Sequence, residues 1–183
     1  MNPLDLLRYP TGKFEWPSAQ PSIENISKAI SILKDFPKLL KEEVSSLNES
    51  QLQTPYREGG WTVAQVVHHL ADSHSHAYLR CKHALLEDSP KIKGYTETDW
   101  AEQEDATSSD LSPSLSIIEG IHHRWVSFFS KLSTAQMERT YFHPEGSKEY
   151  PLYVVLAIYS WHCMHHLEHI RALKKRMGWG FVR

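Results

Sequence analysis

The sequence predicts an all-α protein, a four-helix bundle with a long crossover loop and an extended N-terminal arm. Apolar residues recur at helical spacing in four long stretches, and no stretch of any length alternates with the two-residue period of a strand. The four stretches span residues 22–47, 61–87, 113–132 and 152–177, and a polar connection, 88–112, joins the second to the third. Long helices joined by one crossover and shorter turns are typical of a bundle.

Size and composition fit one domain, residues 1–183. The chain is 40% hydrophobic and has six Trp, eight Tyr and six Phe, which is enough for a real core. Its formal net charge of −2 provides no basic field for nucleic acid. No apolar run reaches the roughly eighteen residues of a membrane span, and the N-terminus lacks a signal-peptide pattern. We therefore expect a cytoplasmic protein, with Cys81 and Cys163 as buried, reduced thiols.

The first 21 residues predict an extended arm, because four prolines and Gly12 disfavour a helix there. Its aromatic residues are expected to pack on the body of the protein. The first long helix then begins after Ser22, a good N-cap residue. Pro37 lies inside the helical pattern and is expected to kink or split this helix.

The second long helix is marked by Thr62 and Gln65, which have the spacing of a capping box. Five histidines lie along residues 61–87: His68, His69, His74, His76 and His83. By periodicity, His74 falls on the buried stripe, whereas His69 falls to one side of it. Periodicity alone thus favours His74 as a ligand from this helix, and a solvated or core histidine is an equal alternative.

The connection 88–112 is long and polar, so it either covers the mouth of a pocket or is a solvated excursion between helices. Ser112 and Pro113 have the pattern of an N-cap followed by a proline in the first turn, which predicts the start of the third helix. His122 lies on the apolar stripe of that helix and is expected in the core or in a pocket wall. A short helical turn, 133–140, and a loop, 141–150, should follow.

The last helix carries four histidines in one eight-residue window. His162 and His166 form one pair at i,i+4 spacing, and His165 and His169 form another. Two imidazoles at this spacing can reach the same metal ion. On a helical wheel, His166 lies roughly 25° from the centre of the apolar stripe, His162 roughly 65°, His169 about 85° and His165 about 125°. A metal site and a pair of hydrogen-bonded core histidines remain equal alternatives at this point.

Two motifs add a family resemblance. The runs GGWTVAQVVHHLADSH (59–74) and YSWHCMHHLEHI (159–170) resemble the DinB superfamily of four-helix metalloproteins, and in particular its YfiT-like branch. That branch is described as metal-dependent hydrolases and is related to bacillithiol S-transferases. The resemblance covers nearly the whole chain and extends to shorter matches at Tyr9-Pro10, 54–61, 124–126, 141–144 and 176–179.

The resemblance implies a metal site made of His69, His162 and His166. It thus selects His69 over His74, because a ligand need only reach the centre of the bundle. It leaves His165 and His169, and more weakly Asp72 and His76, as groups that orient the ligands or shape the pocket. Zinc is the first choice for a three-histidine set and nickel is the alternative, since imidazole itself does not select one divalent metal. Relatives of this branch also imply a homodimer.

Three neutral imidazoles leave coordination positions open, which is typical of a catalytic rather than a structural site. We therefore expect a metal-dependent hydrolase in which the ion activates water. The alternative is a bacillithiol S-transferase, in which the ion activates a low-molecular-weight thiol. A bundle that binds metal without catalysis is a second alternative. Cys163 lies about 80–100° round the helix from His162 and His166, so it is not expected to be a nucleophile. The expected partner is a small-molecule substrate.

Overall fold

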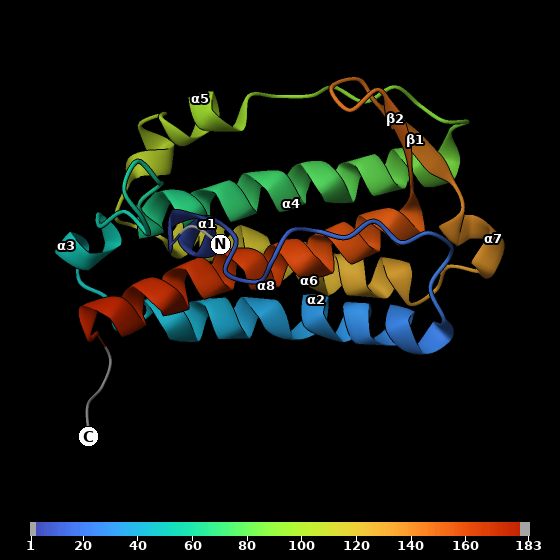
Figure 1. Cartoon of the computed structure of the whole chain (residues 1–183). Coiled ribbons are helices and arrows are strands. Elements are labelled where there is room, and N and C mark those ends of the chain that lie inside the picture. Colours follow the sequence, from blue (N-terminus) through green and yellow to red (C-terminus); the bar gives the residue numbers. More distant parts are fainter. Residues whose placement is uncertain (1–2, 180–183) are drawn as a thin grey trace.

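Four long helices dominate the computed structural model, which describes residues 3–179 (Figure 1). They are α2 (Ile23–Val44), α4 (Val63–Leu86), α6 (Ser112–Phe129) and α8 (Leu152–Met177). The predicted four-helix bundle is therefore confirmed. Within the described residues, no helix combines the length and the apolar character needed to cross a membrane.

The helices form a ring in which each packs against two others. Both α2 and α4 contact α6 and α8, so α2 lies opposite α4 and α6 lies opposite α8. The colour gradient in Figure 1 shows that α4 and α6 run in one direction, and that α2 and α8 run in the other. Because α4 and α6 are parallel, the chain must return along the bundle between them, which explains the long crossover.

The core between the helices is apolar and closely filled. Its largest fully buried side chains are Trp125, Phe36, Leu33, Leu40, Leu70, Ile118, Leu152, Leu156, Leu167, Ile170 and Leu173, together with one histidine, His74. The predicted stripe of α8 is buried at all positions except two: Tyr159 is partly buried and Met177, at the C-terminal end, is 51% exposed. Cys81 and Cys163 are fully buried and free, as predicted.

Local signals place the helix ends. The hydroxyl of Thr62 accepts from the backbone N–H of Gln65, whose side chain accepts from the N–H of Thr62, which confirms the capping box of α4. Gly178 ends α8 in the left-handed conformation, with φ of 70°. Helix α6 begins at Ser112, one residue before the predicted start, because the carboxylate of Asp110 accepts from the N–H of Ser112.

Pro37 does not split α2, which is helical from Ile23 to Val44. A proline lacks the N–H that would bond to the carbonyl four residues earlier, which here is Leu33. Nδ1 of His122, on the neighbouring α6, lies 2.6 Å from that carbonyl oxygen and donates to it. A neighbouring helix thus supplies the donor that Pro37 lacks, and the predicted split is wrong.

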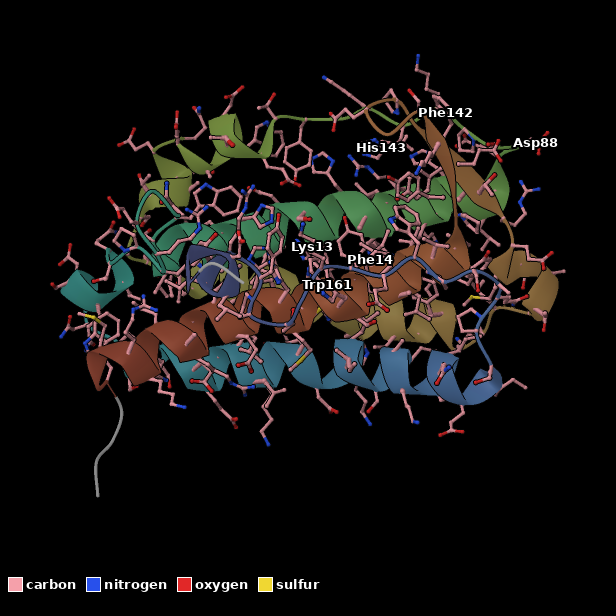
Figure 2. All side chains as sticks on the ribbon, viewed as in Figure 1. Lys13, Phe14, Asp88, Phe142, His143 and Trp161 are labelled. Atoms are coloured by element: carbon pink, nitrogen blue, oxygen red, sulfur yellow. The ribbon has the colours of Figure 1, made fainter. Side chains whose placement is uncertain are left out.

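The N-terminal arm begins with a short helix, α1 (Pro3–Arg8), so the prediction of a wholly extended arm is wrong for these residues. A proline in the first turn of a helix loses no hydrogen bond, which is why Pro3 is compatible with it. After α1 the arm is extended and runs along α8. Figure 2 shows Phe14 of the arm beside Trp161 of α8, with ring centroids 5.9 Å apart.

The crossover contains two short helices, α5 (Glu97–Ala101) and the 3₁₀ turn η1 (Asp105–Thr107). It is packed against α4: the ring of Tyr95 stacks on His76 at 4.6 Å, and the side-chain amide of Gln65 donates to the carbonyl of Ala101. The crossover therefore covers one side of α4.

The smaller elements are α3 (Glu49–Leu52), α7 (Thr134–Met137), β1 (Thr140–His143) and β2 (Lys148–Pro151). The two strands form an antiparallel hairpin in which Tyr141 pairs with Tyr150. This corrects the prediction of a loop over 141–150. With four residues in each strand, the alternation is too short to be recognised in the sequence.

Candidate metal centre

Three histidines from two helices converge inside the bundle. His69 comes from α4, and His162 and His166 come from adjacent turns of α8. One ring nitrogen of each lies within 4.8 Å of the corresponding nitrogens of the other two. The structure therefore brings together the three residues that the family resemblance implied.

The surrounding elements explain why these rings meet. The i,i+4 spacing on α8 places the centroids of His162 and His166 4.4 Å apart. Trp61 precedes the capped start of α4 and packs on His69 at 4.6 Å, and its ring is nearly parallel to that of His166 at 6.4 Å. Trp61 thus holds the ligand from α4 against the pair from α8.

The distance between two of these nitrogens fits a metal ion. Nε2 of His69 and Nε2 of His162 are 3.3 Å apart. Two nitrogens bound to one tetrahedral zinc ion at 2.0–2.1 Å would be separated by about 3.3 Å. The donor set and this spacing are therefore suited to a divalent cation of the zinc type.

Burial keeps the three imidazoles neutral. The side chains of His69 and His166 are buried and that of His162 is partly buried. Burial lowers the pKa of His69 to about 4, and it holds the pKa values of His162 and His166 well below their ordinary range, with smaller contributions from the other histidines. A neutral imidazole keeps a free lone pair, which is the form that binds metal.

A second group of candidate ligands, His74, His122 and Cys163, lies deeper in the core. Nδ1 of His74 and Nε2 of His122 are only 2.7 Å apart, a hydrogen-bond distance that is about 0.6 Å shorter than the separation of two ligands at one tetrahedral ion. Burial also raises the pKa of Cys163 well above its ordinary value, so its thiol stays protonated. In this structure His74 and His122 are hydrogen-bonded to one another in the core, beside the buried thiol.

His74, which periodicity favoured as a ligand, is fully buried on the stripe of α4. It lies next to the three-histidine group rather than in it, because its Nε2 is 3.1 Å from Nδ1 of His162. His122 is buried beside it on α6, in the core as predicted. No pattern in the sequence indicates that these two rings form a hydrogen-bonded chain with His162.

His165 and His169 are buried as well, although the wheel places them far from the apolar stripe. The N-terminal arm covers them: Thr11 Oγ1 is 3.2 Å from Nδ1 of His165, and Nε2 of His169 donates to the carbonyl of Arg8 at 3.1 Å. Nδ1 of His169 is 3.4 Å from Nδ1 of His166. Of the two, His169 is the one that contacts a candidate ligand by hydrogen bonding.

Asp72 and His76 do not take the orienting role that the sequence left open for them. Asp72 lines a hollow of about 310 Å³ together with Asp99, Trp100, Gln103 and Asp105, and none of the three histidines lines it. His76 stacks under Tyr95 of the crossover. Within residues 3–179, no hydrogen bond joins either side chain to His69.

Tyr159, one turn before His162 on α8, is a further polar side chain beside the histidine group. Tyr159 packs 5.5 Å from His162, and its hydroxyl is 3.5 Å from that of Ser73. Burial raises the pKa of Tyr159 to about 12, so its hydroxyl remains a donor at neutral pH. The buried hydroxyl of Tyr95 and the indole N–H of Trp161 have no hydrogen-bond partner among the residues that the structure describes.

Comparisons with known proteins agree with the fold and with metal dependence. A family model described as the DinB superfamily matches residues 32–170. A protein of Geobacillus thermodenitrificans named "Putative metal-dependent hydrolase" is 46% identical over 98% of this chain and 100% of its own length. "Putative metal-dependent hydrolase YfiT" of Bacillus subtilis is 43% identical over 94% of this chain and 97% of its own length.

Two solved structures also match the fold of this chain. A structure described as "YfiT from Bacillus subtilis is a probable metal-dependent hydrolase with an unusual four-helix bundle topology" matches with a TM-score of 0.93 and 42% identity, over 96% of this chain and 99% of that chain. The four-helix bundle protein TT2238 matches with a TM-score of 0.55 and 19% identity, over 80% of this chain and 98% of that chain. The second match supports the fold alone.

Proposed function

The chain belongs to the DinB superfamily, and on that premise we propose that it is a hydrolase that depends on a divalent cation held by His69, His162 and His166. The observation that carries this proposal is the 3.3 Å separation of Nε2 of His69 from Nε2 of His162, across the contact between α4 and α8. The names of its relatives supply the reaction class.

The three ligands determine what chemistry is available. When bound there, a divalent cation with an open coordination position makes a bound water or thiol more acidic and polarises a substrate oxygen. Neutral imidazoles add no negative charge, so the full charge of the cation remains available for this work. Zinc is our first choice of metal and nickel the second, because the imidazole donors suit both.

The groups around the site can bind a small substrate. The hydroxyl of Tyr159 is a neutral donor close to His162. Tyr95 of the crossover has a buried hydroxyl that lacks a partner among the described residues, and such a group costs free energy unless something pairs with it. A substrate with carbonyl or ether oxygens would provide acceptors for these donors.

Thiol transfer is the second candidate reaction. Both cysteines are fully buried, and burial raises the pKa of Cys81 to about 12 and that of Cys163 well above its ordinary value. Neither thiol can act as a nucleophile on a substrate. Any thiol chemistry at this site would therefore use an external low-molecular-weight thiol such as bacillithiol.

The test compares the two reactions in one preparation. The protein is stripped with a chelator, reloaded with zinc or nickel, and incubated with panels of esters, amides and lactones. In parallel, it is given bacillithiol or cysteine with an electrophilic acceptor. Hydrolysis by the wild type but not by His166→Ala supports the proposal. Turnover in the thiol arm alone replaces hydrolysis by thiol transfer, and bound metal without turnover in either arm makes the bundle a non-catalytic metal-binding protein.

A further inference from the structure

A chain of imidazoles leads from the candidate ligand His162 to the backbone of α2. Nδ1 of His162 is 3.1 Å from Nε2 of His74, and Nδ1 of His74 is 2.7 Å from Nε2 of His122. Nδ1 of His122 is 2.6 Å from the carbonyl oxygen of Leu33. The chain thus crosses the core from α8 through α4 and α6 to α2.

The carbonyl at the end of this chain determines the direction of every hydrogen bond in it. A carbonyl oxygen can only accept, so His122 must carry its proton on Nδ1. A neutral imidazole has one N–H and one lone pair, so Nε2 of His122 accepts and His74 must donate from Nδ1. By the same step, Nε2 of His74 accepts from Nδ1 of His162. The proton of His162 is therefore on Nδ1, and its Nε2 carries a lone pair that faces Nε2 of His69.

A second, shorter chain gives the same result for His166. Nε2 of His169 donates to the carbonyl of Arg8, which leaves Nδ1 of His169 as an acceptor. Nδ1 of His166, 3.4 Å away, must then be the donor. The free lone pair of His166 is therefore on Nε2 as well.

Both carbonyls are available because of where they stand in their helices. The carbonyl of Leu33 has no helical partner, since residue 37, four positions later, is a proline. Arg8 is the last residue of α1, and the last carbonyls of a helix have no partner within it. Each chain of histidines thus ends on a backbone oxygen that has no hydrogen-bond donor within its own helix.

We infer that His74, His122 and His169 are positioning residues, which hold both α8 ligands in the tautomer whose Nε2 lone pair faces the metal centre. This inference rests on the proposed metal site. A metal-binding histidine commonly donates its other N–H to a carboxylate, a carbonyl or water, which sets its tautomer and orientation. Here one or two further imidazoles stand between each ligand and its carbonyl.

The competing interpretation is a second metal site at His74, His122 and Cys163. It requires the two nitrogens that are 2.7 Å apart to move about 0.6 Å further from one another. It would also break the link between His162 and the carbonyl of Leu33. A count of bound ions distinguishes the two interpretations: one per chain supports the positioning role, and a second ion held by these three residues overturns it.

The direct test reads the tautomers in the metal-free wild-type protein, so it needs neither activity nor bound metal. Two-bond ¹H–¹⁵N correlation spectra of the imidazoles report which nitrogen carries the proton. We expect Nδ1–H for His162, His166, His74 and His122, and Nε2–H for His169. A proton on Nε2 of His162 or of His166 overturns the inference, even if the protein binds metal at the proposed site.

Substitution tests the effect on the site. His122→Phe and His169→Phe keep an aromatic ring beside Phe36 and on Tyr56, respectively, and remove the nitrogens. Each should weaken zinc affinity about 10- to 100-fold, the usual effect of losing such a partner. In His122→Phe, the spectra should show His162 partly protonated on Nε2. Unchanged affinity and unchanged tautomers in both variants would contradict the positioning role.

The matched control is His68→Phe. His68 is also a buried histidine with two hydrogen bonds, to the hydroxyl of Ser114 and the carbonyl of Ser108, and within residues 3–179 its side chain makes no hydrogen bond to the three-histidine group. Its substitution should leave zinc affinity unchanged. Circular dichroism of each metal-free variant establishes that it is folded. If the wild type binds no zinc while its tautomers are as expected, the proposed function fails and the assignment of the hydrogen-bond chains stands.

Discussion

Nε2 of His69 and Nε2 of His162 are 3.3 Å apart, whereas Nδ1 of His74 and Nε2 of His122, a few ångströms deeper in the same bundle, are 2.7 Å apart. The first distance fits two ligands of one tetrahedral ion, and the second fits only a direct hydrogen bond. The two distances therefore suit two groups of histidines with different roles. One set can hold a cation, and the other fixes the first in place.

The choice of pair on α8 can be tested by alanine substitution. His166→Ala removes one of three proposed ligands and should lower zinc affinity by more than about 100-fold, since losing even an outer partner costs 10- to 100-fold. His165→Ala should leave much of the metal in place, because His165 stacks on Trp161 and its Nδ1 faces Thr11, whereas no hydrogen bond among the described residues joins it to the three ligands. Metal content after dialysis and a competitive zinc titration measure both. Equal loss in the two variants would show that the wrong pair has been chosen.

Removing the metal should reduce activity and leave the fold intact. The apolar core extends over all four long helices and consists of side chains other than the three proposed ligands, so the chelated protein should keep its helical circular dichroism. Zinc at 100 times its dissociation constant should add about 2.7 kcal/mol to the free energy of unfolding. For a protein of this size, that raises the melting temperature by roughly 5–10 °C. Unfolding on chelation would instead indicate a structural metal site.

Most of the fold could be predicted because its helices are long and strongly periodic. The N-caps Ser22 and Thr62 and the terminal Gly178 placed helix ends correctly. The short elements were missed: α1 and the hairpin 140–151 have too few residues to show a period. The effect of Pro37 was also mispredicted, because the donor that compensates for it comes from a residue 85 positions away in the chain.

The candidate site was only partly visible in the sequence. The i,i+4 spacing of His162 and His166 is a local pattern, so it could be read directly. The choice of His69 over His74 depends on how α4 is rotated against α8, which periodicity does not determine, and it needed the family resemblance. The burial of His165 and His169 depends on the N-terminal arm, which joins α8 only in the folded chain.

Glu43 should be the main polar link between α2 and α8. Its carboxylate accepts from Lys174 at 2.7 Å and from Arg171 at 2.8 Å. Burial would raise the pKa of Glu43, but the hydrogen bonds from Lys174 and Arg171 outweigh it, and the pKa is lowered. Glu43→Ala should reduce the free energy of unfolding by about 2 kcal/mol, measured by urea denaturation at pH 7.

The control for this substitution is Glu42→Ala. Glu42 is exposed, and its one ion pair within residues 3–179 is with Lys38 at 3.8 Å, so the change should stay within about 0.5 kcal/mol. The two variants should also differ in their response to acid. Because the folded pKa of Glu43 is lower than the unfolded value, its contribution is present above about pH 4.5 and is lost as the pH falls further. A similar decrease of the free energy of unfolding in Glu43→Ala and Glu42→Ala would contradict a specific role for Glu43.

The buried histidines should make the metal-free protein sensitive to mild acid. Burial lowers the pKa of His122 from 6.5 to about 4, against a smaller opposite effect of the hydrogen bond to Leu33. The unfolded chain therefore takes up a proton between pH 6.5 and 4 that the folded chain does not, and stability falls as the pH falls through this range. At about 1.36 kcal/mol per pH unit, His122 alone should cost about 2 kcal/mol by pH 5.

Urea denaturation at pH 7 and pH 5 measures this effect. The free energy of unfolding at pH 7 exceeds that at pH 5 in the wild type, and this excess should shrink by about 2 kcal/mol in His122→Phe, because the titrating group is gone. Substitution of the neighbouring His123, whose side chain is exposed, should leave the difference as it is in the wild type. A wild-type protein that is equally stable at both pH values would show that His122 is not held neutral by burial.

Pro37→Ala separates the stability of α2 from the organisation of the metal centre. The alanine restores an N–H that competes with Nδ1 of His122 for the carbonyl of Leu33. Replacing a proline inside a helix by alanine should add about 3 kcal/mol, and the weakened bond to His122 should subtract about 1–3 kcal/mol, so the free energy of unfolding should not fall. Zinc affinity should nevertheless decrease several-fold, because His74 and His162 lose the fixed end of their chain.

The control is Lys38→Ala, an alanine substitution at the next position of α2, which is exposed. It should alter neither the free energy of unfolding nor the zinc affinity. Urea denaturation and zinc titration are measured on the same preparation. A Pro37→Ala protein that binds zinc as tightly as the wild type would show that the carbonyl of Leu33 does not act on the metal centre.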